Sequence, residues 1–432
     1  MHIEHYKGVF VIRYFYTLLL FLLSPLLLVT LYKKKPGKPP FGSRWKEHFG
    51  ITPVLKNQSQ RPIWVHTVSV GETIAATPFI RALKQQYPNI PIVITTTTST
   101  GAQQAEKLSD IAEHRYMPID LPFAIKGFLK AIKPQKMLIM ETELWPNVLH
   151  YAHQSGAPIS VINARLSERS AQRYKKFQPI FNLLANNLSQ ILCQHTDDAE
   201  RFIRLGIKNN KIKITGSLKF DISITEEIKQ KAQNLRATLG TNRFIWIAAS
   251  THEGEDDIIL SAHQKLLIKH PNALLILVPR HPERFHNVLL LCQNKKFNTV
   301  SRTSNQPVNL TTEIYLGDTM GEMMTLIGAS DACFIGGSLI GNKVGGHNVL
   351  EPAALSKPIM TGPSYFNFTD IVERLNSCRA LSITKNDNDI FNTLDSLISN
   401  DEMESMGKAA KSFVESNQGA IAKTLRIIDE IH

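Results

Sequence analysis

Cysteine is scarce in this chain of 432 residues, which contains only four. These four, Cys193, Cys292, Cys333 and Cys378, lie far apart, with no Cys-x-x-Cys pair and no His/Cys cluster at zinc-ligand spacing. Closely and regularly spaced cysteines mark disulfide-rich secreted domains and structural zinc sites. The sequence therefore indicates neither a disulfide framework nor a structural metal, and it predicts buried thiols in a reducing compartment.

Two further signatures are missing. The chain has no Gly-x-x-x-x-Gly-Lys-[Ser/Thr] loop, which argues against a P-loop ATPase or kinase. Its formal net charge is +12, but it has no RRM-, KH- or helix-turn-helix-like signature, so we predict no nucleic-acid partner.

Hydrophobic residues make up 43% of the chain and charged residues 20%, which excludes a disordered chain. Its length favours two domains.

Charge is also absent from a long apolar segment near the N-terminus, residues 14–32, which read YFYTLLLFLLSPLLLVTLY. As a helix this segment would span about 28 Å, close to the roughly 30 Å hydrocarbon core of a bilayer. Tyr14, Tyr16 and Tyr32 mark its edges as an interfacial aromatic belt would. Pro25 is compatible with a membrane helix. We therefore predict that this segment crosses a membrane.

The residues after this segment decide between an anchor and a cleaved signal peptide. The apolar run passes directly into KKKPGK without a small-residue cleavage site, so we predict a retained anchor with a basic flank in residues 1–40. By the positive-inside rule, the lysines place the rest of the chain in the cytoplasm, against anionic headgroups. A buried N-terminal helix of a soluble protein is the alternative.

From residue 63 onwards, short apolar runs alternate with amphipathic helical stretches, which is typical of α/β folds with parallel sheets. The alternation breaks at residues 214–225 and then restarts. We therefore predict two open α/β sheets in tandem, in domains 41–215 and 226–414, with a linker at 216–225 and a C-terminal helix at 415–432. The predicted strands are 63–68, 91–96, 136–140, 158–163 and 189–194 in the first domain, and 244–250, 273–279, 313–317, 331–337 and 357–362 in the second.

Two carboxylates follow the predicted strand at 136–140. Glu141 and Glu143 would point the same way if the chain stayed extended, and ligands of open α/β sheets bind beyond the carboxyl ends of the strands. Two neighbouring carboxylates repel, so one should have a raised pKa or pair with a cation. Equally, one of them could cap the helix that begins near Trp145 and Pro146. The sequence leaves both interpretations open.

A third carboxylate, Glu72, begins the helix after the strand at 63–68. A helix N-terminus favours the ionised form, and Gly71 lets another molecule approach closely. This setting suits a general base. An ordinary helix cap made by Ser69 or Glu72 is the more common role for such residues.

The loops after the strands of the second domain are basic or rich in glycine. Arg280 follows the strand at 273–279 and can pair with a phosphate. The glycines after the strand at 331–337 would let backbone N–H groups face an anion at the helix that starts near Asn348, and Glu351 could accept hydrogen bonds from sugar hydroxyls. A plain turn would have a similar sequence. These glycines are Gly336, Gly337, Gly341, Gly345 and Gly346.

Six motifs in order, spread over most of the chain, together resemble the Kdo transferases, the 3-deoxy-D-manno-octulosonic acid transferases of Gram-negative lipopolysaccharide assembly. The motifs are HTVSVGE at 66–72, ETELWPN at 141–147, NARLSERS at 163–170, GSLKFD at 216–221, PRHPERF at 279–285 and GGHNVLEP at 345–352.

The resemblance implies two Rossmann-like domains facing across a cleft, the GT-B architecture, with the acceptor bound by the first and the donor by the second. It implies an inverting glycosyltransferase without metal or cofactor that moves Kdo from CMP-Kdo to a lipid A precursor, lipid IVA. Glu72 would be the general base, and Glu141, Lys219 and less firmly Glu143 would support the transition state. Ser69 and Arg165 are additional candidates. Segments that would contact CMP carry Pro279, Arg280, Met320, Gly321, Glu322, Asn348, Val349, Leu350 and Glu351.

The implied location is the bacterial inner membrane, with a single-pass anchor and both domains on the cytoplasmic side. The expected partners are CMP-Kdo, the lipid A precursor and inner-leaflet lipids. A sugar-nucleotide epimerase on the same fold and a non-catalytic, membrane-tethered nucleotide-binding protein are the alternatives. Basic residues expected to meet acceptor phosphates are Lys33, Lys34, Lys35, Arg44, Lys46, Arg169 and Arg173.

Overall fold

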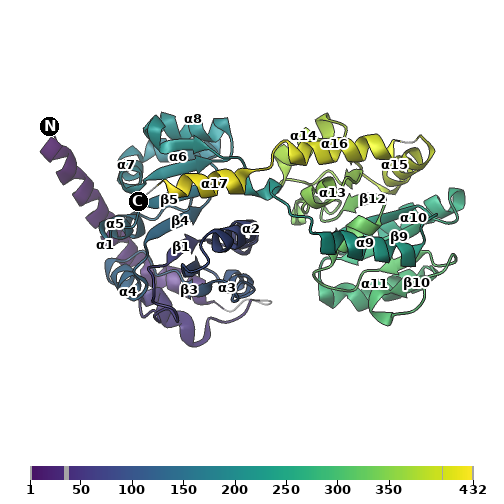
Figure 1. The fold of residues 1–432 in the computed structure, drawn as a ribbon, viewed down its shortest axis with the longest axis horizontal. Coiled ribbons are helices and arrows are strands. Elements are labelled where there is room, and N and C mark those ends of the chain that lie inside the picture. The colour runs from purple at the N-terminus through teal and green to yellow at the C-terminus, as the bar shows by residue number, and fades with distance from the viewer. Residues whose placement is uncertain (1, 34–37, 401, 431–432) are drawn as a thin grey trace. The chain divides into compact units, whose positions relative to one another are not determined.

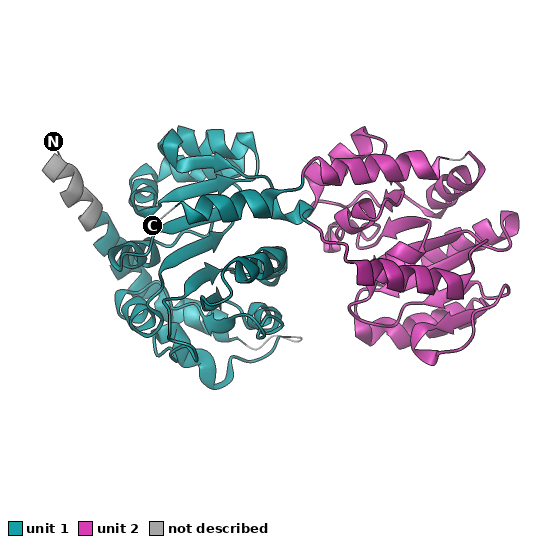
Figure 2. Ribbon diagram, viewed as in Figure 1, with its two compact units in different colours: residues 1–221, 418–432 teal, residues 222–417 magenta. Residues whose placement is uncertain are grey.

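The computed structural model describes residues 2–33, 38–400 and 402–430, with side chains described from Val11 onwards. The chain forms two compact units (Figure 2). Unit 1 comprises Met1–Asp221 and Gln418–His432, and unit 2 comprises Ile222–Asn417. The chain thus crosses from unit 1 to unit 2 after Asp221 and returns to unit 1 after Asn417.

Unit 1 contains a seven-stranded sheet in the order β3-β2-β1-β4-β5-β6-β7, and every neighbouring pair is parallel. Its strands are β1 Ile63–His66, β2 Ile92–Thr96, β3 Glu113–Tyr116, β4 Lys136–Met140, β5 Ile159–Ala164, β6 Gln190–Cys193 and β7 Ile212–Ile214. Its helices are α1 His2–Tyr32, η1 Gly42–Phe49, α2 Val70–Gln86, α3 Ser99–Glu106, α4 Pro122–Ile132, α5 Pro146–Gln154, α6 Glu168–Lys176, α7 Gln178–Asn187, α8 Thr196–Arg204, η2 Asn209–Lys211, η3 Leu218–Phe220 and α17 Ala420–Asp429.

Unit 2 repeats this plan with a second seven-stranded parallel sheet, in the order β10-β11-β9-β8-β12-β13-β14. Its strands are β8 Ile245–Thr251, β9 Leu274–Pro279, β10 Thr299–Ser301, β11 Ile314–Leu316, β12 Ala332–Ile335, β13 Ile359–Thr361 and β14 Leu381–Ile383. Its helices are α9 Glu226–Leu239, α10 Asp256–Lys269, η4 Pro282–Arg284, α11 Phe285–Asn294, η5 Arg302–Ser304, α12 Met323–Ala329, η6 Gly341–Lys343, α13 Leu350–Ala354, α14 Thr369–Ser377, α15 Asp387–Ser399 and α16 Met403–Glu415.

Helices cover both faces of the unit 1 sheet, so its central strands are buried on both sides (Figure 1). Successive side chains of a strand point to opposite faces. Trp64 packs into one core with Phe128 of α4, while its neighbour Val65 packs into the other with Phe79 of α2. Strands buried on both faces read as continuous apolar runs, which is why the sequence shows them clearly.

All the strands predicted from the sequence are present, and both sheets are parallel as expected. The structure adds four strands that the sequence did not indicate, β3, β7, β10 and β14. The prediction of two tandem α/β sheets is confirmed.

The N-terminal helix α1, His2–Tyr32, contains a segment Val11–Tyr32 that is long and apolar enough to cross a membrane by length and composition. The helix continues through Pro25. A proline has no N–H for the carbonyl four residues earlier, which here belongs to Phe21. The hydroxyl of Ser24 donates to that carbonyl at 2.8 Å instead, and it thereby supplies a donor that the proline lacks.

Helix α1 is not isolated from the rest of unit 1. The Arg13 guanidinium donates to Asn147 of α5 at 3.4 Å, and the Tyr16 hydroxyl donates to the Asp120 carboxylate at 2.9 Å. At the other end of α1, the Tyr32 hydroxyl lies 2.7 Å from Nδ1 of His48. Tyr16 and Tyr32 therefore bind the protein body through their hydroxyls, while Tyr14 is exposed.

Candidate functional site

Strands β1 and β4 are neighbours at the point where the strand order of the unit 1 sheet reverses. From β1 the chain continues to β2 and β3 on one side, and from β4 to β5, β6 and β7 on the other. Residues 63–66 pair in parallel register with 136–139, so both strands end at the same edge. Ligands of open parallel sheets bind beyond such a switch point. The loop that leads to Glu72, in the first turn of α2, and the loop that carries Glu141 start there, side by side.

Glu72 caps its own helix, as the more common interpretation of the sequence predicted. The Glu72 N–H donates to the Ser69 hydroxyl at 3.4 Å, and this hydroxyl donates back to one carboxylate oxygen at 3.0 Å. The Val68 N–H donates to the other carboxylate oxygen at 2.8 Å. The bonds from Ser69 and Val68 to the carboxylate use two of its roughly four acceptor positions. The remaining positions can accept a proton from a substrate.

The pKa of Glu72 is raised above its ordinary value. Partial burial is the largest cause, and the negative charges of Glu141 and Glu143 add to it, while hydrogen bonds from Val68 and Ser69 oppose it. The structure therefore brings the three carboxylates within electrostatic range of one another. A carboxylate with a raised pKa is a stronger base than an ordinary one.

The chain does not stay extended after β4, so the condition under which Glu141 and Glu143 would point the same way is not met. Glu141 lies in the left-handed region with φ of 58°, while its N–H donates to the Ile162 carbonyl at 3.0 Å. Glu143 is exposed and accepts a long hydrogen bond, 3.5 Å, from the indole of Trp145.

Neither glutamate caps α5, which was the other interpretation of these two residues. The cap comes from Asp120, whose two carboxylate oxygens accept from the N–H groups of Asn147 at 3.1 Å and Val148 at 2.7 Å. Asp120 precedes α4, and Tyr16 of α1 donates to the same carboxylate. One buried acid thus joins three helices, which the spacing of residues in the sequence does not reveal.

Lys219 lies on η3, a short helix that packs against α2 and α17. The side-chain oxygen of Asn163, at the end of β5, accepts from the Leu218 N–H at 3.1 Å and so fixes η3 beside the sheet edge. Arg165 follows β5 with an exposed side chain, and its carbonyl accepts from the Thr142 hydroxyl. The loops after β4 and β5 are therefore tied together.

His66, the first residue of the motif HTVSVGE, had no predicted role. His66 ends β1 and is buried, with Nδ1 2.9 Å from the Thr95 hydroxyl. Its Nε2 has no hydrogen-bond partner among the described residues, and its ring lies 6.0 Å from that of Trp145. Burial lowers the pKa of His66 to about 4, which keeps the imidazole neutral near pH 7.

In unit 2, the corresponding switch point lies between β8 and β12. His252 follows β8, and its Nε2 lies 2.8 Å from Nε2 of His347, with the two rings stacked. His281 follows β9, with its ring 5.3 Å from that of His252. Burial, together with the charges of neighbouring groups including Arg280, lowers the pKa of His347 to about 4. No spacing pattern in the sequence marks this histidine cluster.

Three of the predicted nucleotide contacts in unit 2 lie close to this cluster. Asn348 donates to the Glu351 carboxylate at 3.1 Å and accepts from the Leu350 N–H at 3.1 Å. Burial raises the pKa of Glu351, against the opposing effects of Asn348 and of the Arg280 charge. The structure therefore brings Arg280, Asn348 and Glu351 together. Pro279, Val349 and Leu350 are buried, so a ligand could reach them chiefly through their backbones.

The other predicted contacts lie between β11 and α12, one strand from Arg280 in the sheet order. Met320 is exposed, and Gly321 has a φ of 83°, a value that favours glycine. Glu322 accepts two hydrogen bonds from the Arg302 guanidinium, at 2.6 and 2.7 Å, and this pairing lowers the pKa of Glu322 to about 2. Its carboxylate is therefore largely committed to Arg302.

The glycine loop after β12 already holds an anion, which belongs to the chain itself. The N–H groups of Gly337, Ser338 and Leu339 donate to the buried carboxylate of Glu255 at 2.6 to 2.8 Å, as does that of His252 at 2.9 Å. The expectation that these glycines present free N–H groups to a ligand is therefore wrong at Gly337. Gly346 also donates within the loop, to the Gly337 carbonyl.

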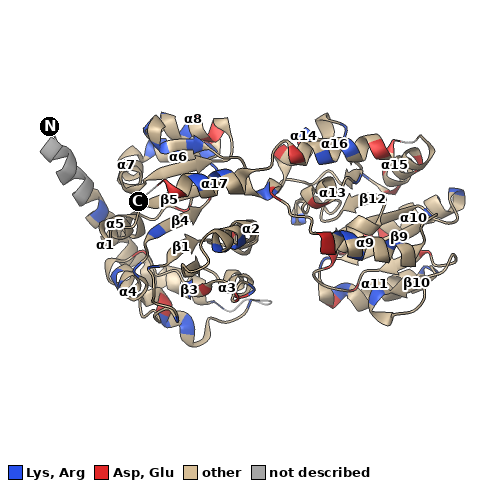
Figure 3. Cartoon of the chain, viewed as in Figure 1, with Lys and Arg blue, Asp and Glu red and all other residues tan. Residues whose placement is uncertain are grey.

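The basic residues expected to meet acceptor phosphates have different surroundings. Arg44 is engaged by the protein, since it pairs with Glu47 at 2.8 Å, bonds to His114 and lies over the ring of Tyr116. Helix α6 carries a group of Lys and Arg residues (Figure 3), and its Arg169 and Arg173 are exposed. Lys33 and Lys46 are also exposed. Lys34 and Lys35 lie outside the described residues.

Two Rossmann-like units in succession, each with polar side chains beyond the switch point of a parallel sheet, define the GT-B architecture. A glycosyltransferase from Rickettsia africae ESF-5 shares this fold with a TM-score of 0.54 and 16% identity, over 86% of this chain and 99% of that one. UDP-GlcNAc 2-epimerase from Neisseria meningitidis does so with a TM-score of 0.53 and 16% identity, over 82% and 98%. At such identity the likeness is one of fold alone.

Sequence relatives identify the family. A model of the family described as 3-deoxy-D-manno-octulosonic-acid transferase (kdotransferase) matches residues 43–222. The 3-deoxy-D-manno-octulosonic acid transferase of Haemophilus influenzae is 39% identical, over 96% of this chain and 98% of that protein. The Bordetella pertussis protein of the same name is 31% identical, over 85% and 87%. The chain belongs to the Kdo transferase family of glycosyltransferases, as the six motifs predicted.

Proposed function

We propose that this protein transfers Kdo from CMP-Kdo to a sugar hydroxyl of a lipid A precursor, lipid IVA, with inversion at the donor carbon and without a metal ion. Membership of the Kdo transferase family supports the reaction class. The observation that carries the residue assignment is the position of Glu72, which lies at the switch point of unit 1 with a raised pKa and unused acceptor positions.

Glu72 acts as the general base in this proposal. A sugar hydroxyl is too weakly acidic to ionise beforehand, so its proton passes to Glu72 as the oxygen bonds to the donor carbon, an effect worth about 10²–10⁴-fold. The bond between that carbon and the CMP phosphate oxygen breaks in the same displacement, and the phosphate leaves with the electron pair. Attack on the face opposite the leaving group inverts the configuration.

The departing CMP phosphate and the developing oxocarbenium charge need fixed partners. Arg280 and Lys219 supply positive charge for the phosphate, and Glu141 supplies negative charge for the oxocarbenium carbon. Asn348 and Glu351 bind hydroxyls of the nucleotide, and the segments at Pro279, Met320–Glu322, Val349 and Leu350 complete the CMP site. Their support is the cluster of Arg280, Asn348 and Glu351 at one edge of the unit 2 sheet.

Helix α1 anchors the enzyme at the bacterial inner membrane through its exposed apolar face, with both units on the cytoplasmic side. Tethering keeps the enzyme at high effective concentration next to a membrane-embedded acceptor. Exposed basic side chains of Lys33, Lys46, Arg169 and Arg173 attract the acceptor phosphates and the anionic lipids of the inner leaflet.

The Glu72→Gln variant tests this proposal, with Glu200→Gln, an exposed glutamate on α8, as the matched control. We expect Glu72→Gln to lose about 10²-fold or more of the transfer rate, to bind CMP-Kdo normally by calorimetry and to keep its fold. The control should match the wild type. Retained turnover would contradict the assignment of the base, and lost donor binding would place Glu72 at the donor instead.

The reaction itself is tested on the wild type. CMP release should require the lipid acceptor, and the mass of the glycolipid product should increase by Kdo units. Release of CMP without an acceptor, or no product with one, would contradict the transfer reaction and would favour the epimerase alternative.

A further inference from the structure

A groove runs between α1 and the body of unit 1. Its narrower part is a cavity of about 360 Å³. The α1 wall consists of Tyr16, Leu20, Ser24, Leu27, Leu28 and Leu31. These positions recur every three or four residues, so they form one face of the helix.

The opposite wall of this cavity belongs to the body of unit 1. It includes Thr97 after β2, Met117 and Leu121 before α4, and Trp145 before α5. Most of these surfaces are apolar. One polar atom stands out, because Nε2 of the buried His48, which also lines the cavity, has no hydrogen-bond partner in the described part of the chain. An unmatched polar atom in an apolar wall is unfavourable unless a ligand satisfies it.

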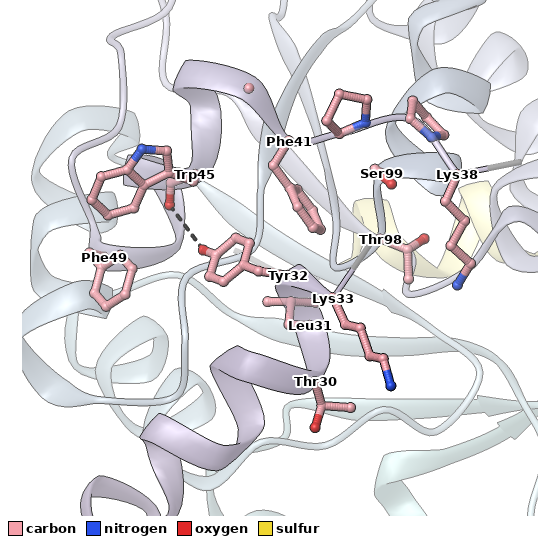
Figure 4. A pocket seen from close by; sticks show the side chains of 13 residues that line it. Thr30, Leu31, Tyr32, Lys33, Lys38, Phe41, Trp45, Phe49, Thr98 and Ser99 are labelled. Carbon is pink, nitrogen blue, oxygen red and sulfur yellow. Dashed lines mark hydrogen bonds between the residues drawn. The ribbon is translucent and has the colours of Figure 1, made fainter. Parts of the chain in front are cut away.

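The groove continues at the C-terminal end of α1 into a wider cavity of about 930 Å³, which shares Leu31 with the first. Figure 4 shows its aromatic side chains Tyr32, Phe41, Trp45 and Phe49, with Lys33 and Lys38 on the other side of the view. An apolar channel that opens beside two ammonium groups suits an amphiphile with an anionic headgroup.

The other face of α1 is open to its surroundings. Leu18, Leu22, Leu26 and Val29 are exposed there, and they are spaced along a second stripe of the helix. An exposed apolar stripe on a helix long enough to cross a bilayer faces lipid when the helix is in the membrane. A lipid could therefore pass sideways from the bilayer around α1 into the groove.

Two residues of the groove wall, Trp145 and Thr97, connect the groove to the proposed catalytic carboxylates. Trp145 lines the groove and donates to Glu143. Thr97 also lines it and donates to the Val68 carbonyl at 3.0 Å, and the N–H of the same Val68 holds the Glu72 carboxylate. Only one residue of the β1–α2 loop thus separates the groove wall from the proposed base.

We propose that this groove binds acyl chains of the glycolipid acceptor, so that α1 is part of the acceptor site as well as an anchor. This inference rests on the proposed function, since the acceptor headgroup must present its hydroxyl to Glu72. The chains lie along Leu20, Leu28 and Leu31 of α1, beside the ring of His48. The acceptor phosphates lie near Lys33 and Lys38.

The kinetic test fills the groove without altering the proposed catalytic residues. Leu28→Trp places a larger side chain in the groove, and Leu26→Trp places the same side chain on the exposed face of the same helix. Two acceptors are compared in mixed micelles, the acylated glycolipid and the same phosphorylated sugar without acyl chains.

We expect Leu28→Trp to raise KM for the acylated acceptor by about tenfold or more, with kcat and the kinetics of the deacylated acceptor unchanged. Leu26→Trp should behave as the wild type with both acceptors. An equal KM for the acylated acceptor in both variants would overturn the proposal, as would an equal loss with both acceptors. If the wild type transfers Kdo to neither acceptor, the proposed function fails. This result can be told apart from the two outcomes that would overturn the groove proposal alone.

A binding test identifies the occupant without relying on turnover. Bromine atoms on an acyl chain quench nearby tryptophan emission, and Trp45 also lines the groove. A brominated acceptor should therefore quench the full-length Trp45→Phe protein, and adding Trp145→Phe to that variant should remove most of the quenching. A brominated phosphatidylglycerol at the same mole fraction should quench Trp145 much less. Equal quenching by the two lipids would assign the groove to bulk membrane lipid, and undiminished quenching in the double variant would place the chain elsewhere. Either result would overturn the proposal.

Discussion

Glu72 and Glu141 influence each other through their charges at the switch point of the unit 1 sheet. The negative charge of Glu141 is one of the causes that raise the pKa of Glu72, after burial. A general base must be ionised to work, so the rate should fall as the pH drops through the pKa of Glu72. The acid limb of the pH–rate profile therefore reports the environment of this single carboxylate.

The Glu141→Gln variant removes that charge while it keeps the size of the side chain. Less repulsion lowers the pKa of Glu72, so we expect the acid limb of kcat/KM to move to lower pH, whatever happens to the maximal rate. Glu143→Gln should move the limb in the same direction by less, because Glu143 contributes less to the shift. The profile is measured with saturating CMP-Kdo. A limb that stays in place or moves to higher pH in Glu141→Gln would contradict the role of Glu72.

At this scale, the sequence indicates which residues reach the sheet edge but not how they are oriented. Glu72 and Glu141 could be found because they follow apolar strands. The left-handed backbone conformation of Glu141 could not be predicted, because it depends on how the chain leaves β4 beside Ile162 of the neighbouring strand β5. Glu255 could not be matched to the glycine loop either, because the carboxylate and the N–H groups lie far apart in the sequence.

The secondary-structure elements that the sequence missed share one position in the fold. β3 and β7 are the edges of the first sheet, and β10 and β14 are the edges of the second. An edge strand of a parallel sheet is less completely covered, so its residues need not all be apolar. β7 reads IKI, with two of its three residues exposed. β3 reads EHRY, and its polar side chains are buried in hydrogen bonds such as that between His114 and the Thr96 hydroxyl at 2.9 Å. Apolar runs therefore reveal central strands and miss edges.

The Asp120 carboxylate is the strongest candidate for a residue that holds whole elements together. It caps α5 through two N–H groups and accepts from Tyr16 of α1. In Asp120→Asn, an amide group replaces one acceptor oxygen and leaves at least one buried donor unmatched, which costs about 1–3 kcal/mol. We expect a lower free energy of unfolding for unit 1 and faster proteolysis between α1 and η1.

Urea unfolding of the full chain in detergent, followed by limited proteolysis, measures this effect. Asp110→Asn is the control, because Asp110 makes an exposed ion pair with Arg81, and such pairs contribute about 0–1 kcal/mol. If both variants lost the same stability, or if α1 stayed equally protected in Asp120→Asn, Asp120 would not be what holds α1 to unit 1.

At the scale of the whole molecule, unit 1 is assembled from two separate parts of the chain, which the sequence did not show. Amphipathic patterns predicted a C-terminal helix, but an apolar face indicates only that a helix has a partner and not which one. In the structure, α17 returns to unit 1, where Ala420 and Ile428 join the core that also contains Val65. Unit 2, in contrast, is one continuous stretch, Ile222–Asn417, with a core of its own.

The return of α17 makes the stability of unit 1 depend on the last residues of the chain. The Asp221 carboxylate accepts from the N–H groups of Gly419 and Ile421 at the start of α17, and Lys136 of β4 donates to the Ile428 carbonyl at 2.8 Å. Truncation after Asn417 removes these bonds and exposes the apolar core beneath them. We expect the thermal transition of unit 1 to fall by ten degrees or more, about what a loss of several kcal/mol produces.

Differential scanning calorimetry of the full chain in detergent can separate the two units, because CMP should stabilise only the one that binds it. In the truncated protein, the CMP-sensitive transition of unit 2 should keep its midpoint and its response to CMP, while the other transition falls or disappears. Truncation after Asp429, which keeps α17, is the control and should leave both midpoints in place. A parallel loss of both transitions after truncation at Asn417 would show that the units fold as one, because a helix that stabilises unit 1 alone cannot lower the midpoint of an independent unit 2.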